Sequence, residues 1–247
     1  MNRIASLLTA LVLTAAAPAF AQTAVEFTAA PDDPAAARVE PMLREAVPAV
    51  EAFFGQPFAE PVRFVLARDR ASFDAAFPPA WEMGATRCWM VGVGVADFLV
   101  LLSPDVWATQ ACDHSGSAEE VRGILTHELV HTYHGQRNPS RDFTGAEDAS
   151  WFVEGLAVLA SGQLTDQRLA GVREAVRRGE GPTGLDSVWA GRGRYGQAGS
   201  LALYLDETYG RARLNDLLAA RNSADLLSRL GTTEADLVRG WRAWLIR

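Results

Sequence analysis

The pentapeptide His127-Glu128-Leu129-Val130-His131 constrains this chain more than any other stretch of its sequence. Two histidines four residues apart lie on one face of an α-helix, one turn from each other, so their ring nitrogens can bind the same metal ion. The intervening Glu128 is offset around the helix and can reach a metal-bound water. The pattern predicts zinc ligands at His127 and His131, with Glu128 as a general base. The alternative is a surface helix that carries two incidental histidines.

The residues around the pentapeptide predict the helix that such a site needs. Ser117 and Glu120 form an S-x-x-E capping box, and Glu119 adds negative charge to the first turn, where the helix dipole favours it. Apolar residues then recur at helical spacing, and Gly135 followed by Asn138-Pro139 marks the end. We expect a helix of about five turns, with both histidines at the edge of its buried face.

A third ligand is predicted in a second apolar segment, at residues 151–157. The metzincin pattern would place glycine at position 134 and histidine at position 137, but the chain has His134 and Arg137 there. Glu154 is the single acid of the apolar segment, and a buried carboxylate is costly unless it is paired or binds a metal. Two histidines and Glu154 would leave the fourth zinc position open for water, as a catalytic site requires.

The two motifs, HELVH and WFVEGLA, resemble those of the gluzincin metallopeptidases, in particular the peptidase MA superfamily, whose second motif commonly reads W-x-x-E-G-x-A. The resemblance covers residues 117–162 and extends more loosely over 195–210. It implies a zinc site with Glu128 as the base and with the ligands His127, His131 and Glu154. It also implies an edge strand along the cleft that pairs with an extended peptide substrate, for which the region Trp89–Leu102 is the candidate.

The chain departs from the thermolysin-type pattern in two respects. The gap between His131 and Glu154 is longer. The acid that those enzymes carry four residues after the ligand glutamate is Val158 here. The sequence therefore identifies no partner that would orient a ligand histidine.

Tyr195 is a second catalytic candidate, and it rests on the resemblance. In related gluzincins a tyrosine or histidine on a later element donates a hydrogen bond to the oxyanion that forms when water attacks the carbonyl. Tyr195 follows a Gly- and Arg-rich run and opens a predicted helix, which would place it over the cleft. The alternative is a core aromatic residue that packs against Leu201 and Tyr204.

Four other polar or charged residues lie near the two motifs. Glu147 and Asp148 lie in a polar stretch, and helix capping is favoured over metal binding for them. His134 lies seven residues after His127, on nearly the same face, and is either a substrate-binding residue or an ordinary polar residue near the helix end. His114 is assigned no function.

The N-terminus predicts export. Arg3 precedes an apolar core at 4–17, and Ala19-Phe20-Ala21 matches a cleavage site, so residues 1–21 are interpreted as a signal peptide. That core is shorter than the ~20 residues that span a bilayer, and no other stretch is long and apolar enough. We expect a periplasmic or secreted protein without a membrane span.

The composition limits the kinds of partner that the protein is expected to bind. Apolar residues make up 49% of the chain, which indicates a folded globule, and the net charge of −7 argues against nucleic acid and anionic membranes. In an exported protein, Cys88 and Cys112 are interpreted as a disulfide, with metal ligation as the alternative.

Hydrophobic periodicity predicts an α+β fold in a single domain at 22–247. An N-terminal α/β lobe (22–113) would hold a mixed sheet with helices at 34–54 and 69–77, a strand at 61–67 and, at 89–102, a hairpin or a bent pair of strands. A mainly helical lobe (114–247) would follow, with the zinc site between the lobes. Its helices after the two motifs are expected at 165–178, 198–209, 212–220 and 234–246, and a loop at 179–196. Gly92-Val93-Gly94 does not indicate a nucleotide loop, because no βαβ context follows.

These features together predict an exported zinc metallopeptidase that hydrolyses peptide or protein substrates with a zinc-activated water. Two alternatives stay open. One is a zinc hydrolase of a non-peptide amide or ester, because the site does not specify the acyl group. The other is a non-catalytic binding module that keeps the fold and the metal.

Overall fold

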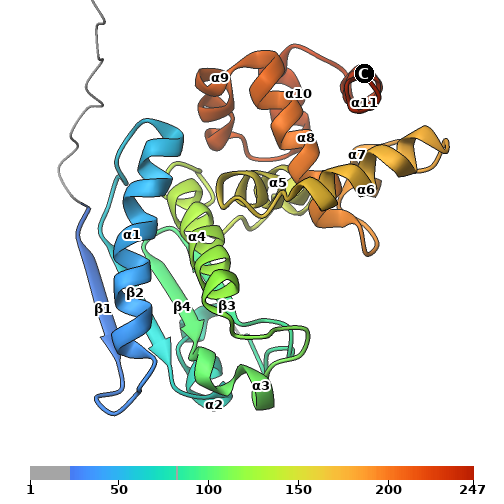
Figure 1. Cartoon of the computed structure of the whole chain (residues 1–247). Helices are drawn as coiled ribbons and strands as arrows, with labels where there is room; N and C mark the ends of the chain where they lie inside the picture. Colours follow the sequence, from blue (N-terminus) through green and yellow to red (C-terminus); the bar gives the residue numbers. More distant parts are fainter. Residues whose placement is uncertain (1–22, 82) are drawn as a thin grey trace, which may run out of the picture.

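The computed structural model describes residues 23–81 and 83–247 (Figure 1). Its strands are β1 (Val25–Ala29), β2 (Val62–Ala67), β3 (Gly92–Val95) and β4 (Phe98–Leu102). Its α-helices are α1 (Ala36–Phe54), α2 (Arg70–Ala75), α3 (Trp107–Gln110), α4 (Ala118–Gly135), α5 (Ser150–Ala160), α6 (Asp166–Arg177), α7 (Leu185–Val188), α8 (Arg194–Tyr209), α9 (Arg211–Asp216), α10 (Ser223–Leu230) and α11 (Glu234–Leu245). The predicted α+β class is confirmed. The predicted signal peptide lies outside the described residues.

The four strands form one mixed sheet in the order β1-β2-β4-β3. β1, β2 and β4 are parallel, whereas β3 runs antiparallel to β4, with Gly92 opposite Leu101 and Val95 opposite Phe98. All five residues of β4 are buried, as expected of a central strand that is covered on both faces. The hairpin predicted within 89–102 is confirmed, and its first strand, β3, forms one edge of the sheet.

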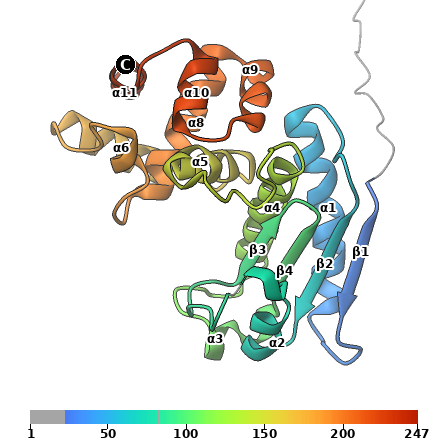
Figure 2. The ribbon, with the colours of Figure 1, turned by 180° about the vertical axis from the view of Figure 1, so that it is seen from behind.

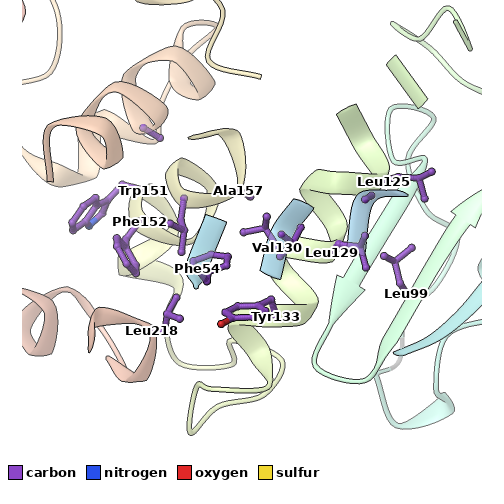
Figure 3. Packing of buried hydrophobic residues seen from close by; sticks show 14 of the residues in the cluster. Phe54, Leu99, Leu125, Leu129, Val130, Tyr133, Trp151, Phe152, Ala157 and Leu218 are labelled. Atoms are coloured by element: carbon purple, nitrogen blue, oxygen red, sulfur yellow. The ribbon is translucent and has the colours of Figure 1, made fainter. Parts of the chain in front are cut away.

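Helices α1 and α4 cover one face of this sheet (Figure 1 and Figure 2). Figure 3 shows Leu125 and Leu129 of α4 beside Leu99 of β4. At its other end α4 packs on α1, where the ring of Tyr133 stacks on that of Phe54 with centroids 4.2 Å apart. These apolar contacts fix α4, the helix that carries both histidines, against the sheet.

The rest of the chain is helical. α5 packs against α4 and α8, and α6, α7 and α11 also pack on α8 (Figure 1). Figure 3 shows Trp151 and Phe152 of α5 in the same buried cluster as Leu218. α7 lies within the segment 179–196, where a loop was predicted. The carboxylate of Glu234, 49 residues away, accepts the N–H of Leu185 at the start of α7, so this short helix depends on a tertiary contact.

Cys88 and Cys112 form the predicted disulfide, with Cα atoms 5.3 Å apart. It joins the segment before β3 to the segment that leads into α4. None of the helices within residues 23–81 and 83–247 is both long enough and apolar enough to cross a membrane.

Candidate metal centre

The helix that carries the histidines is α4, and its 18 residues match the five turns predicted. Ser117 Oγ accepts the N–H of Glu120 at 3.2 Å, as a capping box requires. A capping box also requires the Glu120 carboxylate to accept the N–H of Ser117. Here the carboxylate instead accepts the N–H groups of Ser115 and Gly116, at 2.7 and 3.1 Å. One half of the predicted capping box therefore forms.

α4 is buried more deeply than a one-sided apolar stripe predicts. Every residue from Leu129 to Gly135 is buried, because the sheet, α1 and α5 surround this half of the helix. His127 and His131 are only 7% and 8% exposed. Electrostatic interactions at such a site are stronger than they would be in water.

Glu154 of α5 faces the two histidines. The Nε2 atoms of His127 and His131 lie 3.1 Å apart, and Glu154 Oε2 lies 3.4 Å from the first and 3.8 Å from the second. A tetrahedral ion held at 2.0–2.1 Å separates its ligand atoms by about 3.4 Å, so the three atoms have the spacing of one metal site. The three predicted ligands thus form a cluster that could hold a metal ion.

The charge states of the cluster suit a cation. Burial lowers the pKa of His131 to about 4, so this ring is neutral at pH 7. Burial opposes ionisation of Glu154, but the neighbouring His131 and His127 outweigh it and hold the Glu154 pKa below its ordinary value. Burial also lowers the pKa of His127, but Glu154 and Glu128 outweigh it and raise the pKa. A metal binds the neutral form of an imidazole, so it would compete with a proton for the His127 ring.

Gln163 orients His127. The Nδ1–H of His127 donates to Gln163 Oε1 at 3.0 Å, which leaves the Nε2 lone pair on the side of His131 and Glu154. Gln163 is itself held through its main-chain carbonyl oxygen. This oxygen accepts hydrogen bonds from the N–H of Thr165 at 2.9 Å and from the guanidinium of Arg168 at 2.6 Å. The sequence showed no such partner, because Gln163 lies in a turn after α5, 36 residues from His127.

Glu128 lies beside the cluster and lines the adjacent cavity. Burial raises the pKa of Glu128 to about 7. The negative charge of Glu154 also raises this pKa, whereas His127 and the backbone N–H of Gly94 lower it. A carboxyl group with a pKa near 7 can accept and return a proton at neutral pH, which a general base must do.

Two glycines bring β3 close to α4. A Cβ on Gly92 would lie 2.9 Å from Cγ of Glu128, and a Cβ on Gly94 would lie 2.1 Å from the backbone oxygen of Glu128. The Gly92-Val93-Gly94 sequence is therefore explained by the approach of the edge strand to the histidine helix.

Two cavities open at the cluster. The larger, of about 480 Å³, is lined by Glu154 as well as by His127 and Glu128. The smaller, of about 280 Å³, is lined by Gln163 together with the same His127 and Glu128. Gly92 of β3 and Tyr195 border both. A ligand at the cluster therefore has room on two sides.

Tyr195 lies in the first turn of α8, half-buried on the wall of both cavities. Its ring centroid is 6.4 Å from that of His127 and 5.0 Å from that of Trp189. Burial, together with the charge of Glu154, raises the Tyr195 pKa above its ordinary value of 10.0. The hydroxyl thus remains a donor at neutral pH, and its catalytic role stays a prediction.

His134 and the two nearby acids do not join the cluster of His127, His131 and Glu154. The His134 Nε2–H donates to the carbonyl of Leu218 at 3.1 Å, and burial lowers the His134 pKa to about 3. Asp148 accepts the N–H of Ser223 at the start of α10, at 3.2 Å. Glu147 accepts an N–H from the turn that precedes it, at 3.1 Å. His134 is a buried structural residue, and the acids cap backbone N–H groups.

The chain was compared with protein-family models, with curated proteins and with solved structures, and none of these matches it.

Proposed function

We propose that this protein is an exported zinc-dependent metallopeptidase of the gluzincin type. The proposal rests on two histidines and Glu154 that have the spacing of a single metal site. Beside them lies Glu128, with a pKa of about 7. A His/His/Glu donor set suits zinc and leaves a position open for water. The Cys88–Cys112 disulfide is in keeping with an oxidising compartment.

Each residue has a defined part in the proposed reaction. When bound, zinc would lower the pKa of a coordinated water toward about 7 and polarise the carbonyl that is attacked. The two histidines and Glu154 would hold the ion, and Gln163 keeps the His127 lone pair directed toward it. Glu128 would accept the proton of the water and pass it to the leaving amine. The Tyr195 hydroxyl would donate to the carbonyl oxygen as it gains negative charge.

An extended peptide is the substrate that suits this cleft. β3 is an edge strand at the cleft, and an edge strand can pair with a peptide main chain. The two cavities leave room for chain on both sides of the bond to be cleaved. A binding module would not need a base such as Glu128 beside the ligands, which favours catalysis.

Removal of zinc is expected to abolish hydrolysis and to lower the melting temperature. A ligand that binds only the native state, at a thousand times its dissociation constant, stabilises that state by about 4 kcal/mol. The protein would be assayed on a peptide library and on a panel of amides and esters, before chelation, after it and after zinc is restored. Calorimetry would give both melting temperatures.

Three results would contradict the peptidase proposal. Peptide cleavage that survives chelation would exclude the zinc mechanism. Zinc-dependent cleavage of amides or esters without cleavage of peptides would indicate a non-peptide hydrolase. Zinc binding without hydrolysis of any compound would indicate a binding module.

Gln163→Leu is expected to weaken zinc binding by about 10–100-fold. Leucine cannot accept the Nδ1–H of His127, so the ring would no longer be fixed in the tautomer that binds metal. Gln163→Glu keeps an acceptor and should bind zinc at least as tightly as the native protein. The dissociation constant would be measured by competition with a chromophoric chelator, with Gln167→Leu on the exposed surface of α6 as the control. Equal zinc affinity in Gln163→Leu and the native protein would exclude the orienting role.

A further inference from the structure

We propose that Trp89 is a substrate-binding residue that selects an aromatic or large aliphatic side chain next to the bond that is cleaved. The inference rests on the proposed function, because it concerns the same cleft. Trp89 is 45% exposed, and among the described residues the other large hydrophobic residue with such exposure is Ile246, at 50%, beside the C-terminal residue. A single exposed apolar side chain is ordinary on a protein surface, so the location and support of Trp89 decide its meaning.

Trp89 lies where the two cavities of the cleft meet. It lines the larger cavity together with Val93 and Phe143, and the smaller one together with Ile124. Glu128 lines both cavities as well, so Trp89 borders the same space as the proposed general base. A substrate side chain that packs on this indole would remove apolar area of both partners from water, and an aromatic one could also stack.

The backbone of Trp89 is held on several sides. The preceding residue, Cys88, forms the disulfide with Cys112, whose N–H also donates to the Cys88 carbonyl at 3.1 Å. The guanidinium of Arg70 donates to the Cys88 carbonyl at 3.3 Å and to the carbonyl of the residue after Trp89. The His114 Nε2–H donates to the carbonyl of Trp89 itself at 2.9 Å. The side chain is thus exposed while its main chain is fixed.

These contacts give a role to residues that the proposed reaction does not use. The disulfide and His114 take no part in zinc binding or proton transfer, yet both converge on the main chain at Trp89. The other ring nitrogen of His114, Nδ1, lies 2.8 Å from Oε1 of Glu120 in α4. The Trp89 segment is thereby tied to the helix that carries the metal ligands. An apolar anchor with a fixed main chain loses little conformational freedom when it binds, so more of its contact energy appears as affinity.

Binding without turnover would test the role of Trp89. Zinc-loaded Glu128→Gln protein would be titrated by calorimetry with end-blocked alanine hexapeptides that carry Phe, Leu, Ala or Asp at one central position. With Trp89 in place, the Phe and Leu peptides should bind about 10-fold more tightly than the Ala peptide. Trp89→Ala should reduce this preference to less than about 2-fold, and Trp89→Phe should restore most of it. Ile246→Ala, at the other exposed hydrophobic residue, should leave the preference unchanged.

A second variant tests whether the restrained main chain at Trp89 contributes to the preference, with the indole itself left in place. Cys88→Ser/Cys112→Ser keeps Trp89 but removes one restraint on its main chain, so the preference for Phe over Ala should fall by about 3-fold while bound zinc stays at one equivalent. A full preference in Trp89→Ala, or no preference in the protein with Trp89, would overturn the inference. Failure of the native protein to bind zinc or to cleave peptides would instead overturn the proposed function, so the two failures are distinct.

Discussion

Glu128→Gln is expected to keep its zinc and to lose hydrolysis, with kcat lower by about 10²–10⁴-fold. Glutamine has nearly the shape of glutamate but cannot accept the proton of the attacking water. The proposed ligand atoms belong to His127, His131 and Glu154, so metal binding should persist. The fold should persist as well, because the folded-state pKa of Glu128, about 7, lies above its unfolded value. The carboxyl therefore lowers stability progressively as the pH rises from 4.5 to about 7, and the neutral amide removes that loss.

The matched control for this variant is Glu119→Gln on the same helix. Glu119 is exposed in the first turn of α4 and undergoes the same chemical change without touching the metal cluster. We expect it to retain native kcat and to lose at most a few tenths of a kcal/mol of stability through the helix dipole. Bound zinc would be measured by atomic absorption and kcat on a peptide that the native protein cleaves. Native kcat in Glu128→Gln would exclude Glu128 as the base.

The sequence predicts the cluster because its spacing is local. One turn of helix places His127 and His131 together wherever that helix lies in the fold, so no tertiary information is needed. Glu154 is predictable for a different reason, since it is the single acid in an apolar segment that must be buried. The same local logic accounts for the β3–β4 hairpin, whose two strands follow each other in the chain.

Features that depend on distant contacts escape the sequence. Gln163 is an unremarkable residue of a polar turn until the fold brings it to His127. α7 is four residues long and depends on Glu234 from α11. The glycines of β3 are visible in the sequence, but only the packing of β3 on α4 explains them. The same holds for Trp89, whose support comes from residues before β3 and before α4.

Gly94→Ala is expected to destabilise the protein by about 3 kcal/mol or more. The added Cβ would lie 2.1 Å from the backbone oxygen of Glu128 and 2.9 Å from Oγ1 of Thr132. The closer of these atoms belongs to the main chain of α4, which is packed on its other sides by α1 and α5 and cannot yield by a side-chain rotation. The strand would have to separate from the helix, and the cleft edge would move with it. Urea denaturation, monitored by circular dichroism, would give the free energy of unfolding.

Gly171→Ala makes the same chemical change where the structure predicts the opposite sign. Gly171 is exposed in the middle of α6, and a Cβ there would meet no atom within 4 Å. Alanine costs less conformational entropy in a helix, so this variant should be more stable by about 0.5–1 kcal/mol. The pair separates the general effect of replacing glycine from the specific contact between β3 and α4. Similar free energies of unfolding for Gly94→Ala and the native protein would show that the strand does not lie this close to the helix, and the placement of the cleft edge would then be wrong.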